Sequence, residues 1–460
     1  MKFYTNLNLL ICLCLLSILG CSDENRLTSS AQNYGGDGLF APAAQETVVT
    51  FQALYLTHFK TLEEYKAVQN PISKRQVLDL TMFLFGPLTH RQLAGVHRPE
   101  DVTVHSADPV LKNGLVYVPF TYHGRWLIRD SILDDSQLII PLPYNSEIVY
   151  SKGWKNCTDS HPSHQTQSMM WYYWDPARIN CDHQLGVHYQ NVVVEKGEIH
   201  QQTILSYPEY HSMIKNVADQ RTLSMTFAFG YVEDPAQPRP FKDSDSGAME
   251  FQDFNRVAQQ TLAPLGFKSQ PLLASNYQST SNLRIGTKWL GQINGVDIEI
   301  KIVISAVIDQ MDLFAKSYAQ DHDGFFGWFG HSRVGSGFDA EQFRRKLLYQ
   351  PHLFTLSQEY QLIYWAGCNS YSYYTTPFFE MKAQLNPNLD PKGTKKLDIM
   401  SNALPSYFAF NAHNAEVMLN ALIGFNTPKS YQDIITQLES HGNSWDVPVI
   451  VNVLGDEDNQ

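Results

Sequence analysis

The spacing of apolar residues changes along the chain, and the C-terminal half alternates between two periods. Runs rich in β-branched and aromatic residues indicate strands at 222–231, 283–290, 296–304, 324–331 and 361–366, with a further strand from 396–401 and 404–408. Apolar residues at helical spacing indicate helices at 248–265, 306–318, 339–348 and 414–423. This alternation predicts an α/β domain over 220–460, with a mostly parallel sheet flanked by helices.

The segment from 46 to 206 has a different pattern. Its apolar residues fall in short β-branched and aromatic runs between turn residues, as at 115–121, 126–129 and 138–143. Few stretches with helical spacing interrupt these runs. We therefore predict an N-terminal β-rich, sandwich-like domain, so that the fold class is α/β plus all-β.

Composition narrows the classes of function. With 43% hydrophobic and 17% charged residues, the chain is globular and not disordered. Its formal net charge of -12 argues against nucleic acid as a partner and against direct binding to anionic headgroups. The glycine-containing loop 332–337 lacks the phosphate-binding patterns of nucleotide sites, so we predict no nucleotide and no other cofactor.

The N-terminus has the features of an export signal. Lys2 precedes the apolar stretch 7–19, which is too short and wrongly flanked to span a membrane. The stretch ends in Ile18-Leu19-Gly20-Cys21, which resembles the lipobox of bacterial lipoproteins. The resemblance implies that the signal peptide 1–20 is removed and that Cys21 carries lipid. The alternatives are an ordinary secretory signal and an anchor that stays uncleaved.

The residues after the lipobox suggest a location and a tether. Ser22 follows Cys21, and in the lipoproteins that the motif resembles this favours the outer membrane over retention in the inner one. The segment 21–45 is polar and contains Gly35-Gly36, which is typical of a flexible tether. We therefore predict a cell-envelope protein, periplasmic or surface-facing, whose membrane partner is reached through acyl chains such as palmitate.

Export changes the meaning of the six cysteines. Two leave with the signal peptide, and Cys21 takes lipid. In an oxidising compartment, Cys157 and Cys181 remain as a possible pair, and Cys368 has no partner. Cys368 is then a free reactive thiol, an intermolecular link or a buried inert thiol.

The segment 157–188 is dense in His, Trp and Tyr, and it contains enough ligands of the right type for zinc. These are Cys157, His161, His164, Cys181 and His183. A disulfide between Cys157 and Cys181 explains the two sulfurs more simply, and we favour it over a zinc site or two free thiols, so we predict no metal. The run 171–174 (WYYW) is either an exposed platform for glycans or peptides or part of a core, and we favour the core.

The two residues with the clearest chemistry follow two of the predicted strands. His331 ends the run GFFGWFGH, and Cys368 follows the run YQLIYWAG. Side chains beyond the carboxyl ends of parallel strands gather at one edge of the sheet, where active sites of such sheets lie. A cysteine and a histidine placed there can act as nucleophile and base.

At this point the chain resembles the caspase-like cysteine peptidases, a group that includes caspases, gingipains, clostripain and separase. The resemblance covers about 221–424 and rests on a strand ending in Phe329-Gly330-His331-Ser332, a helix, and a strand ending in Ala366-Gly367-Cys368-Asn369. It implies that Cys368 is the nucleophile and His331 the general base and acid. It also implies that backbone amides of Cys368 and near Ser332 stabilise the oxyanion, with a peptide or protein as substrate.

Two positions depart from the pattern of that group. It usually has Gly directly after the His, where this chain has Ser332, and it often has Ala directly before the Cys, where this chain has Gly367. Asn369 follows the cysteine and is predicted at the rim of the site. Arg333 either orients a substrate carboxylate or belongs to a turn into the helix at Asp339.

Further charged residues have simpler interpretations beside functional ones. Arg333, Asp339 and Glu380 are charged candidates nearby in sequence, but the sequence assigns no residue to a substrate pocket. The sequence Asp321-His322-Asp323-Gly324 is half of a calcium loop, but no Glu follows at the required spacing, so we favour a turn.

These features predict a membrane-anchored cysteine hydrolase, an endopeptidase that uses the Cys368/His331 dyad. The alternative is a non-catalytic envelope lipoprotein with a degenerate caspase-like fold, which binds a protein or a glycan.

Overall fold

The computed structural model describes residues 41–68, 74–96, 102–133, 137–151, 153–159, 165, 170–199, 206–217, 219–232, 243–273, 284–305, 310–332, 340–349, 355–445 and 447–455. Met1–Asn33 and Tyr34–Gln460 are separate units, and every element below belongs to the second. The predicted signal peptide, Cys21 and the tether up to residue 40 lie outside the described residues. Within the described part of the chain, the helices are all too short or too polar to cross a bilayer.

The first sheet is antiparallel and has seven strands in the order β2-β5-β1-β7-β6, with β3 and β4 also pairing with β5. The strands are β1 (Ala44–Leu56), β2 (Ala94–Gly95), β3 (Thr103–Ser106), β4 (Val110–Lys112), β5 (Leu115–Arg129), β6 (Leu138–Pro143) and β7 (Tyr189–Ile199). Two runs predicted as separate strands merge in β5, which pairs with β1 from Tyr117 to Arg129. The β-rich character of this segment is therefore confirmed.

Helices cover this sheet to an extent that the sequence pattern did not predict. They are α2 (Leu62–Lys66), α3 (Lys74–Thr81), η1 (Met82–Leu84), the π-helix η2 (Phe85–His90), α4 (Asp130–Leu133), α5 (Ser146–Ser151), η4 (Trp154–Cys157) and α6 (Met170–Tyr173). Leu80, Phe85 and Tyr172 from these helices share a core with strand residues such as Phe51 and Tyr122. In the described residues, helices thus take the place of the second sheet that a sandwich requires.

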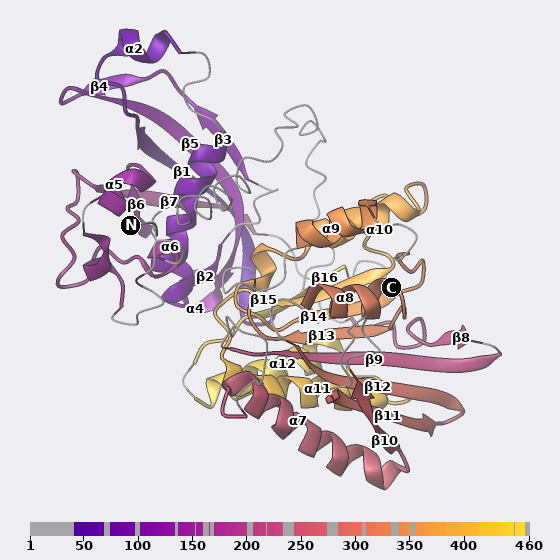
Figure 1. Cartoon of the computed structure of the whole chain (residues 1–460). Coiled ribbons are helices and arrows are strands. Elements are labelled where there is room, and N and C mark those ends of the chain that lie inside the picture. The colour runs from indigo at the N-terminus through magenta and orange to yellow at the C-terminus, as the bar shows by residue number, and fades with distance from the viewer. Residues whose placement is uncertain are drawn as a thin grey trace, which may run out of the picture. The chain divides into compact units, whose positions relative to one another are not determined.

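The second sheet has nine strands in the order β10-β11-β12-β9-β13-β14-β15-β16, with β8 pairing with β9. They are β8 (Lys215–Val217), β9 (Gln220–Gly230), β10 (Lys268–Leu273), β11 (Arg284–Ile293), β12 (Val296–Ser305), β13 (Phe325–Phe329), β14 (Gln361–Trp365), β15 (Leu397–Asn402) and β16 (Val451–Leu454). The five strands from β12 to β15 are parallel, whereas β8, β10, β11 and β16 pair antiparallel. The sheet is mixed with a parallel centre, as the alternation of strands and helices predicts (Figure 1).

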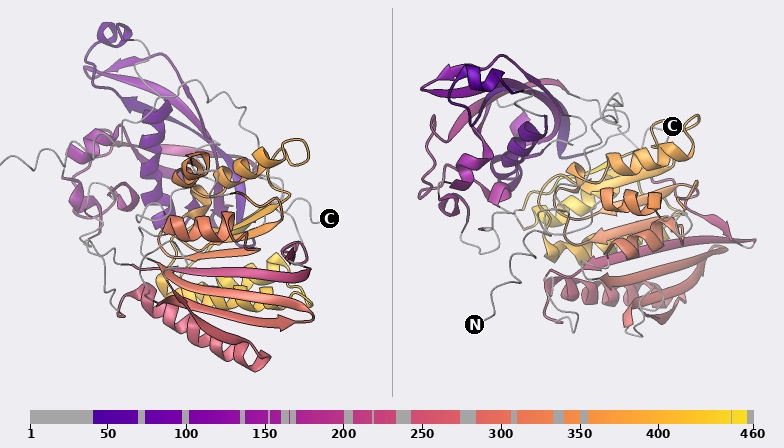
Figure 2. Two further views of the ribbon diagram at one scale, coloured as in Figure 1. Left: turned by 45° about the vertical axis from the view of Figure 1, so that its right-hand side comes forward. Right: turned by 45° about the horizontal axis from the view of Figure 1, so that its top comes forward.

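Helices cover both faces of the second sheet (Figure 2). One core includes residues of α7 (Ser246–Leu262), α11 (Asn411–Ile423) and α12 (Tyr431–Asn443). The other includes residues of α8 (Gln310–Ala319), α9 (Ala340–Tyr349) and α10 (Thr376–Leu385). Alternate residues of β13 point into the two cores, with Phe325 and Phe329 in the first and Phe326 and Trp328 in the second. This two-sided burial explains why β13 is a continuous apolar run.

One predicted strand segment is wrong. Residues 404–408 continue no strand after β15, and Phe408–Phe410 form a short 3-10 helix instead. Pro405 has no backbone N–H to donate to a neighbouring strand. The chain therefore leaves the sheet after Asn402 and passes over its carboxyl edge. The strands of the first sheet lie between residues 44 and 199, and those of the second between residues 215 and 454. The domain boundaries predicted at 206 and 220 stay predictions.

Candidate active site

The strand register places His331 and Cys368 level with each other. The parallel strands β13 and β14 are paired so that Trp328 is opposite Trp365. His331 and Cys368 each lie three residues beyond these partners. Both residues therefore follow the carboxyl ends of adjacent parallel strands, as the sequence pattern predicts.

The chain segments that carry the two residues are in close contact. A Cβ atom at Gly367 would lie 2.9 Å from the carbonyl oxygen of Gly330 and 3.1 Å from the backbone nitrogen of Ser332. Only glycine allows this approach, because any other side chain has a Cβ atom. The departure from the caspase-like pattern at Gly367 therefore has a local cause. It brings the amide of Ser332 next to the residue before Cys368.

The ring of His331 is held by a backbone carbonyl. Its Nε2 lies 3.2 Å from the carbonyl oxygen of Val232, just after β9. A carbonyl can only accept, so this contact assigns the ring proton to Nε2 and leaves Nδ1 free to take a proton. Burial lowers the pKa of His331, against the opposite effects of the Val232 carbonyl and Asp245. The resting imidazole is therefore neutral at neutral pH.

Asp245 supports this arrangement from the start of α7. Its carboxylate accepts hydrogen bonds from the backbone N–H of Val232, with both oxygens at 3.1 Å. It also caps the helix by accepting from the amides of Gly247 and Ala248. The same side chain thus fixes the helix start and the residue whose carbonyl holds His331.

The sulfur of Cys368 is engaged by the segment that crosses the edge of the sheet. Sγ lies 3.4 Å from the carbonyl oxygen of Ser406 and 3.4 Å from its backbone nitrogen. The residue is partly exposed. Burial nevertheless raises the pKa of the Cys368 thiol, against the opposite effect of these backbone hydrogen bonds. The lowered pKa expected of an activated cysteine is therefore not found in the resting site.

His331 and Cys368 border the same short segment of chain. The ring of His331 packs edge-on against Phe408, with 5.0 Å between ring centroids, while the sulfur of Cys368 contacts Ser406. Residues 406–408 thus contact both side chains. Among the described residues, no hydrogen bond joins the Cys368 sulfur to the His331 ring.

The remaining predicted site residues fall into different environments. Ser332 is 1% exposed, and its hydroxyl finds no hydrogen-bond partner within the described ranges. Asn369 is fully buried in the left-handed conformation (φ 51°), and its amide donates to the hydroxyl of Tyr172 at 3.0 Å. Its side chain is therefore used inside the protein and does not form a rim. Arg333 and Asp339 lie outside the described residues, and Glu380 is on α10.

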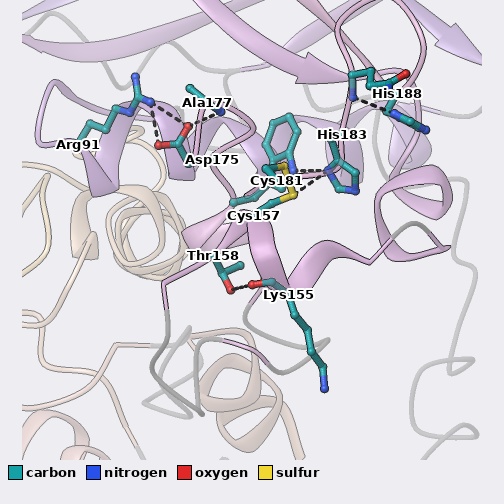
Figure 3. Close-up of a disulfide and its surroundings, with 11 residues drawn as sticks. Arg91, Lys155, Cys157, Thr158, Asp175, Ala177, Cys181, His183 and His188 are labelled. Atoms are coloured by element: carbon teal, nitrogen blue, oxygen red, sulfur yellow. Dashed lines mark hydrogen bonds and ion pairs between the residues drawn. A yellow bond between two sulfur atoms is a disulfide. The ribbon is translucent and has the colours of Figure 1, made fainter. Parts of the chain in front are cut away.

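The predicted disulfide between Cys157 and Cys181 is confirmed (Figure 3). The Nδ1 of His183 lies 3.4 Å from the Cys157 sulfur and accepts a hydrogen bond from the Trp174 indole at 3.0 Å. His161 and His164, which completed the zinc alternative, lie outside the described residues. Because the two sulfurs are bonded to each other, neither is a thiolate ligand in this state.

Two other predictions concern residues away from the edge. Trp174 is fully buried and Tyr172 is 4% exposed, which confirms core packing for half of the WYYW run. Asp321 and Asp323 both form ion pairs with Lys301, at 2.7 and 2.9 Å. A lysine thus neutralises the carboxylates of the half calcium loop, in line with the turn that we favoured.

The contacts that organise the edge were not visible in the sequence. The Val232 carbonyl has no sequence signature, and the aromatic run around Tyr172 gave no sign of its distant partner Asn369. The site is therefore defined by its geometry: a histidine after β13, a cysteine after β14, and a shared border at 406–408. Comparisons of the chain with protein-family models, with curated proteins and with solved structures found no match.

Proposed function

We propose that the protein is a cysteine hydrolase, an endopeptidase with a caspase-like α/β domain, held at the cell envelope by lipid on Cys21. Cys368 is the nucleophile and His331 is the general base and acid. The observation that carries this proposal is the common border of the two side chains along 406–408, at the carboxyl edge of a sheet with a parallel centre.

The reaction starts from a neutral pair. As the Cys368 sulfur attacks the peptide carbonyl carbon, the thiol proton passes to the free Nδ1 of His331. Collapse of the tetrahedral intermediate breaks the C–N bond, and His331 returns the proton to the leaving amine. Water then hydrolyses the thioester with the same imidazole as base, which restores the thiol. The Val232 carbonyl stabilises the imidazolium because its partner Nε2 stays protonated throughout.

The oxyanion of the intermediate requires donors beside the sulfur. The amides of Cys368 and Ser332 are suited to this, because the close packing of Gly367 on Gly330 and Ser332 brings the two segments together. A backbone amide does not depend on the side chain that follows His331. Serine in place of glycine therefore leaves this donor available.

A second candidate function is supported by the state of the thiol. Burial raises the pKa of Cys368, and both backbone polar groups of Ser406 engage its sulfur. A structural cysteine in a non-catalytic envelope lipoprotein has this character. In that case the protein binds a protein or a glycan, and the dyad is a relic.

One experiment separates the two functions. The chain from Ser22 onward retains the whole unit Tyr34–Gln460 and carries no lipid. Alkylation of Cys368 by iodoacetamide is followed across pH by mass spectrometry, together with cleavage of a peptide library. The variants are Cys368→Ala and His331→Ala, with the exposed His105→Ala of β3 as the matched control.

The hydrolase predicts peptide cleavage that Cys368→Ala and His331→Ala abolish and that His105→Ala leaves unchanged. It also predicts that native Cys368 is alkylated, because the residue is partly exposed. Absence of cleavage, with alkylation only after addition of denaturant, would overturn the hydrolase in favour of the binding protein.

A further inference from the structure

Residues 405–409, which we call the strap, cross the carboxyl edge of the second sheet after β15. The chain is anchored on both sides of the strap. Ala403 and Leu404, which precede it, are buried in a core of the second sheet. Phe410, which follows it, is 4% exposed and packs edge-on against His441 of α12, with 5.1 Å between ring centroids. The strap therefore connects two fixed points.

The strap itself is less buried than its anchors. Pro405, Ser406 and Phe408 are partly exposed, and Tyr407 and Ala409 are exposed. The part before Phe408, where the 3-10 helix η10 begins, belongs to no helix or strand. A segment with this exposure, outside the hydrogen-bond ladders of the sheet, opens at a lower cost than the buried chain on either side.

The strap contacts both residues of the dyad. The carbonyl oxygen and the backbone nitrogen of Ser406 each lie 3.4 Å from the sulfur of Cys368. Two residues further on, the ring of Phe408 stands edge-on to the ring of His331, with 5.0 Å between centroids. The strap therefore passes from the sulfur to the imidazole.

The direction of the strap is that of a peptide in the proposed reaction. There the attacked carbonyl lies at the sulfur, and the next residue supplies the amine that the imidazole protonates. In the strap, the carbonyl at the sulfur belongs to Ser406, and the chain continues through Tyr407 to Phe408 at His331. The contacts of Ser406 are made by its main chain, which every peptide has. A peptide can therefore replace the strap in the same direction.

The resting contacts of the strap differ from those of a reacting peptide. The Cys368 thiol donates to the carbonyl oxygen of Ser406, whereas a nucleophile attacks the carbon. The N–H of Ser406 is directed at the same sulfur. Burial raises the pKa of Cys368, so the thiol beside the strap stays protonated at neutral pH. The strap thus holds the sulfur in an unreactive state.

We propose that the strap occupies the place of the substrate, so that a peptide displaces it and binds in the same direction, with an aromatic side chain two residues after the attacked carbonyl against the ring of His331. Phe408 takes the place of that side chain in the resting protein. This inference rests on the proposed hydrolase. It adds the direction of the substrate and the class of one of its side chains, and it makes the resting site autoinhibited.

The test uses the chain from Ser22 onward and internally quenched peptides with the residue order of the strap, Leu-Pro-Ser-Tyr-Xaa, where Xaa is Phe, Ala or Asp. Iodoacetamide reports access to Cys368 without turnover, and each rate is divided by the rate with glutathione. The variants are Phe408→Ala and Phe408→Leu, which keeps bulk but not the ring. Tyr349→Ala on α9, where the side chain is 82% exposed, is the control, and Cys368→Ala is the blank.

Loosening of the strap should raise access to the sulfur. Loss of the Phe408 ring should speed alkylation of Cys368 by about two- to tenfold, the factor that corresponds to one aromatic contact. The KM of every cleaved peptide should fall by about the same factor, because less of the binding energy is used to open the site. The kcat should not change, since Phe408 leaves with the strap before the reaction. Tyr349→Ala should behave as the wild type.

The peptides test the direction and the side chain. Mass spectrometry should find cleavage after Ser, and the Phe peptide should exceed the Ala and Asp peptides in kcat/KM by about two- to tenfold. This order should persist in the Phe408 variants, because the side chain that contacts His331 then comes from the peptide. Circular dichroism verifies folding. If Phe408→Ala does not fold, Phe408→Leu decides the matter.

The outcomes separate this inference from the function on which it rests. Cleavage that depends on Cys368, with alkylation rates and KM values that are the same in the Phe408 variants and the wild type, would overturn the inference and leave the hydrolase intact. A preference for the Asp peptide would do the same. Faster alkylation in the Phe408 variants without cleavage of any peptide would overturn both, and the strap would then only cover a structural thiol.

Discussion

At the amino edge of the nine-stranded sheet, Asp323 is 1% exposed and its two oxygens accept hydrogen bonds from Ser224 and Thr226 and pair with Lys301. At the carboxyl edge, Cys368 and His331 are bonded to main-chain atoms of Ser406 and Val232. At the first edge, the charges of Asp323 and Lys301 neutralise each other. The second edge holds two side chains through main-chain atoms and without an ion pair to either of them among the described residues.

The comparison shows that burial of a titratable group does not by itself indicate function. Such a group indicates function only when its partners in the fold do not use all of its hydrogen-bonding and proton-binding capacity. Burial by itself would raise the pKa of Asp323, but Lys301 and three hydroxyl donors bring it below its usual value. A carboxylate held in this way has a structural role. At the carboxyl edge, the described contacts of Cys368 and His331 are with main-chain atoms and one aromatic ring. This contrast between the two edges has measurable consequences.

The largest expected effect is on stability at the amino edge. Asp323→Ala leaves the buried Lys301 with fewer carboxylate partners and the hydroxyls of Ser224 and Thr226 without an acceptor. We expect a loss of about 3–5 kcal/mol in the free energy of unfolding, measured with urea. Asp253→Ala, which removes an exposed pair with Arg256 on α7, is the control and should cost less than about 1 kcal/mol.

The pH dependence of the same variant gives an independent check. The folded pKa of Asp323 lies below its unfolded value, so its contribution is present above the unfolded pKa and is lost as pH falls through the folded one. The stability difference between the wild type and Asp323→Ala should therefore shrink in acid, below about pH 4. A difference that stays constant from pH 7 to pH 3 would contradict the charged network.

At the carboxyl edge the expected effect is on rate. His331→Ala removes the proposed proton acceptor but no buried charge, so kcat should fall by about 10²- to 10⁴-fold. The free energy of unfolding should change by only about 1–2 kcal/mol, from lost packing against Phe408. Steady-state kinetics and urea unfolding on the same sample measure both. A large loss of stability with unchanged kcat would mean that the two edges are alike.

A smaller effect is expected where the two site segments touch. Gly367→Ala places a methyl group 2.9 Å from the Gly330 carbonyl oxygen, which should cost about 1–3 kcal/mol and displace Cys368 from His331. Activity should fall more than stability. Gly197→Ala in β7 is the matched control, because its nearest neighbour is Val48 at an ordinary 3.4 Å. Equal behaviour of the two variants would contradict the close approach of the site segments.

The parts of the fold that the sequence predicts well are those with a repeated local pattern. The strands β13 and β14 are buried on both faces, so apart from Gln361 they lack polar residues and form continuous apolar runs. Residues 404–408 (LPSYF) also contain apolar and aromatic residues that suggested a strand. Pro405 and the contact of Ser406 with Cys368 instead bring this segment across the edge of the sheet, an outcome that depends on tertiary contacts.

The candidate site divides in the same way. The positions of His331 and Cys368 follow from strand order, which local patterns reveal. The partners of these residues do not: the Val232 carbonyl belongs to another strand end, and Tyr172 belongs to the N-terminal part of the chain. Asn369 was predicted at a rim because it follows the cysteine, but its left-handed turn directs the amide into the core. Hydrogen bonds between distant segments leave no periodic trace in the sequence.

The smallest expected effect concerns Asp245, a carboxylate that influences His331 without contacting its ring. Asp245→Asn keeps a side-chain oxygen that can cap α7, so the free energy of unfolding should fall by at most about 1 kcal/mol. It removes a negative charge that raises the pKa of His331, against the larger effect of burial. The acidic limb of the kcat/KM profile, which reports the free imidazole, should therefore move to lower pH. Asp433→Asn at the start of α12, where the carboxylate also belongs to a helix cap, is the control and should leave the profile unchanged. If the two variants shift the profile equally, Asp245 has no specific influence on His331 and serves only to cap α7 and to hold Val232.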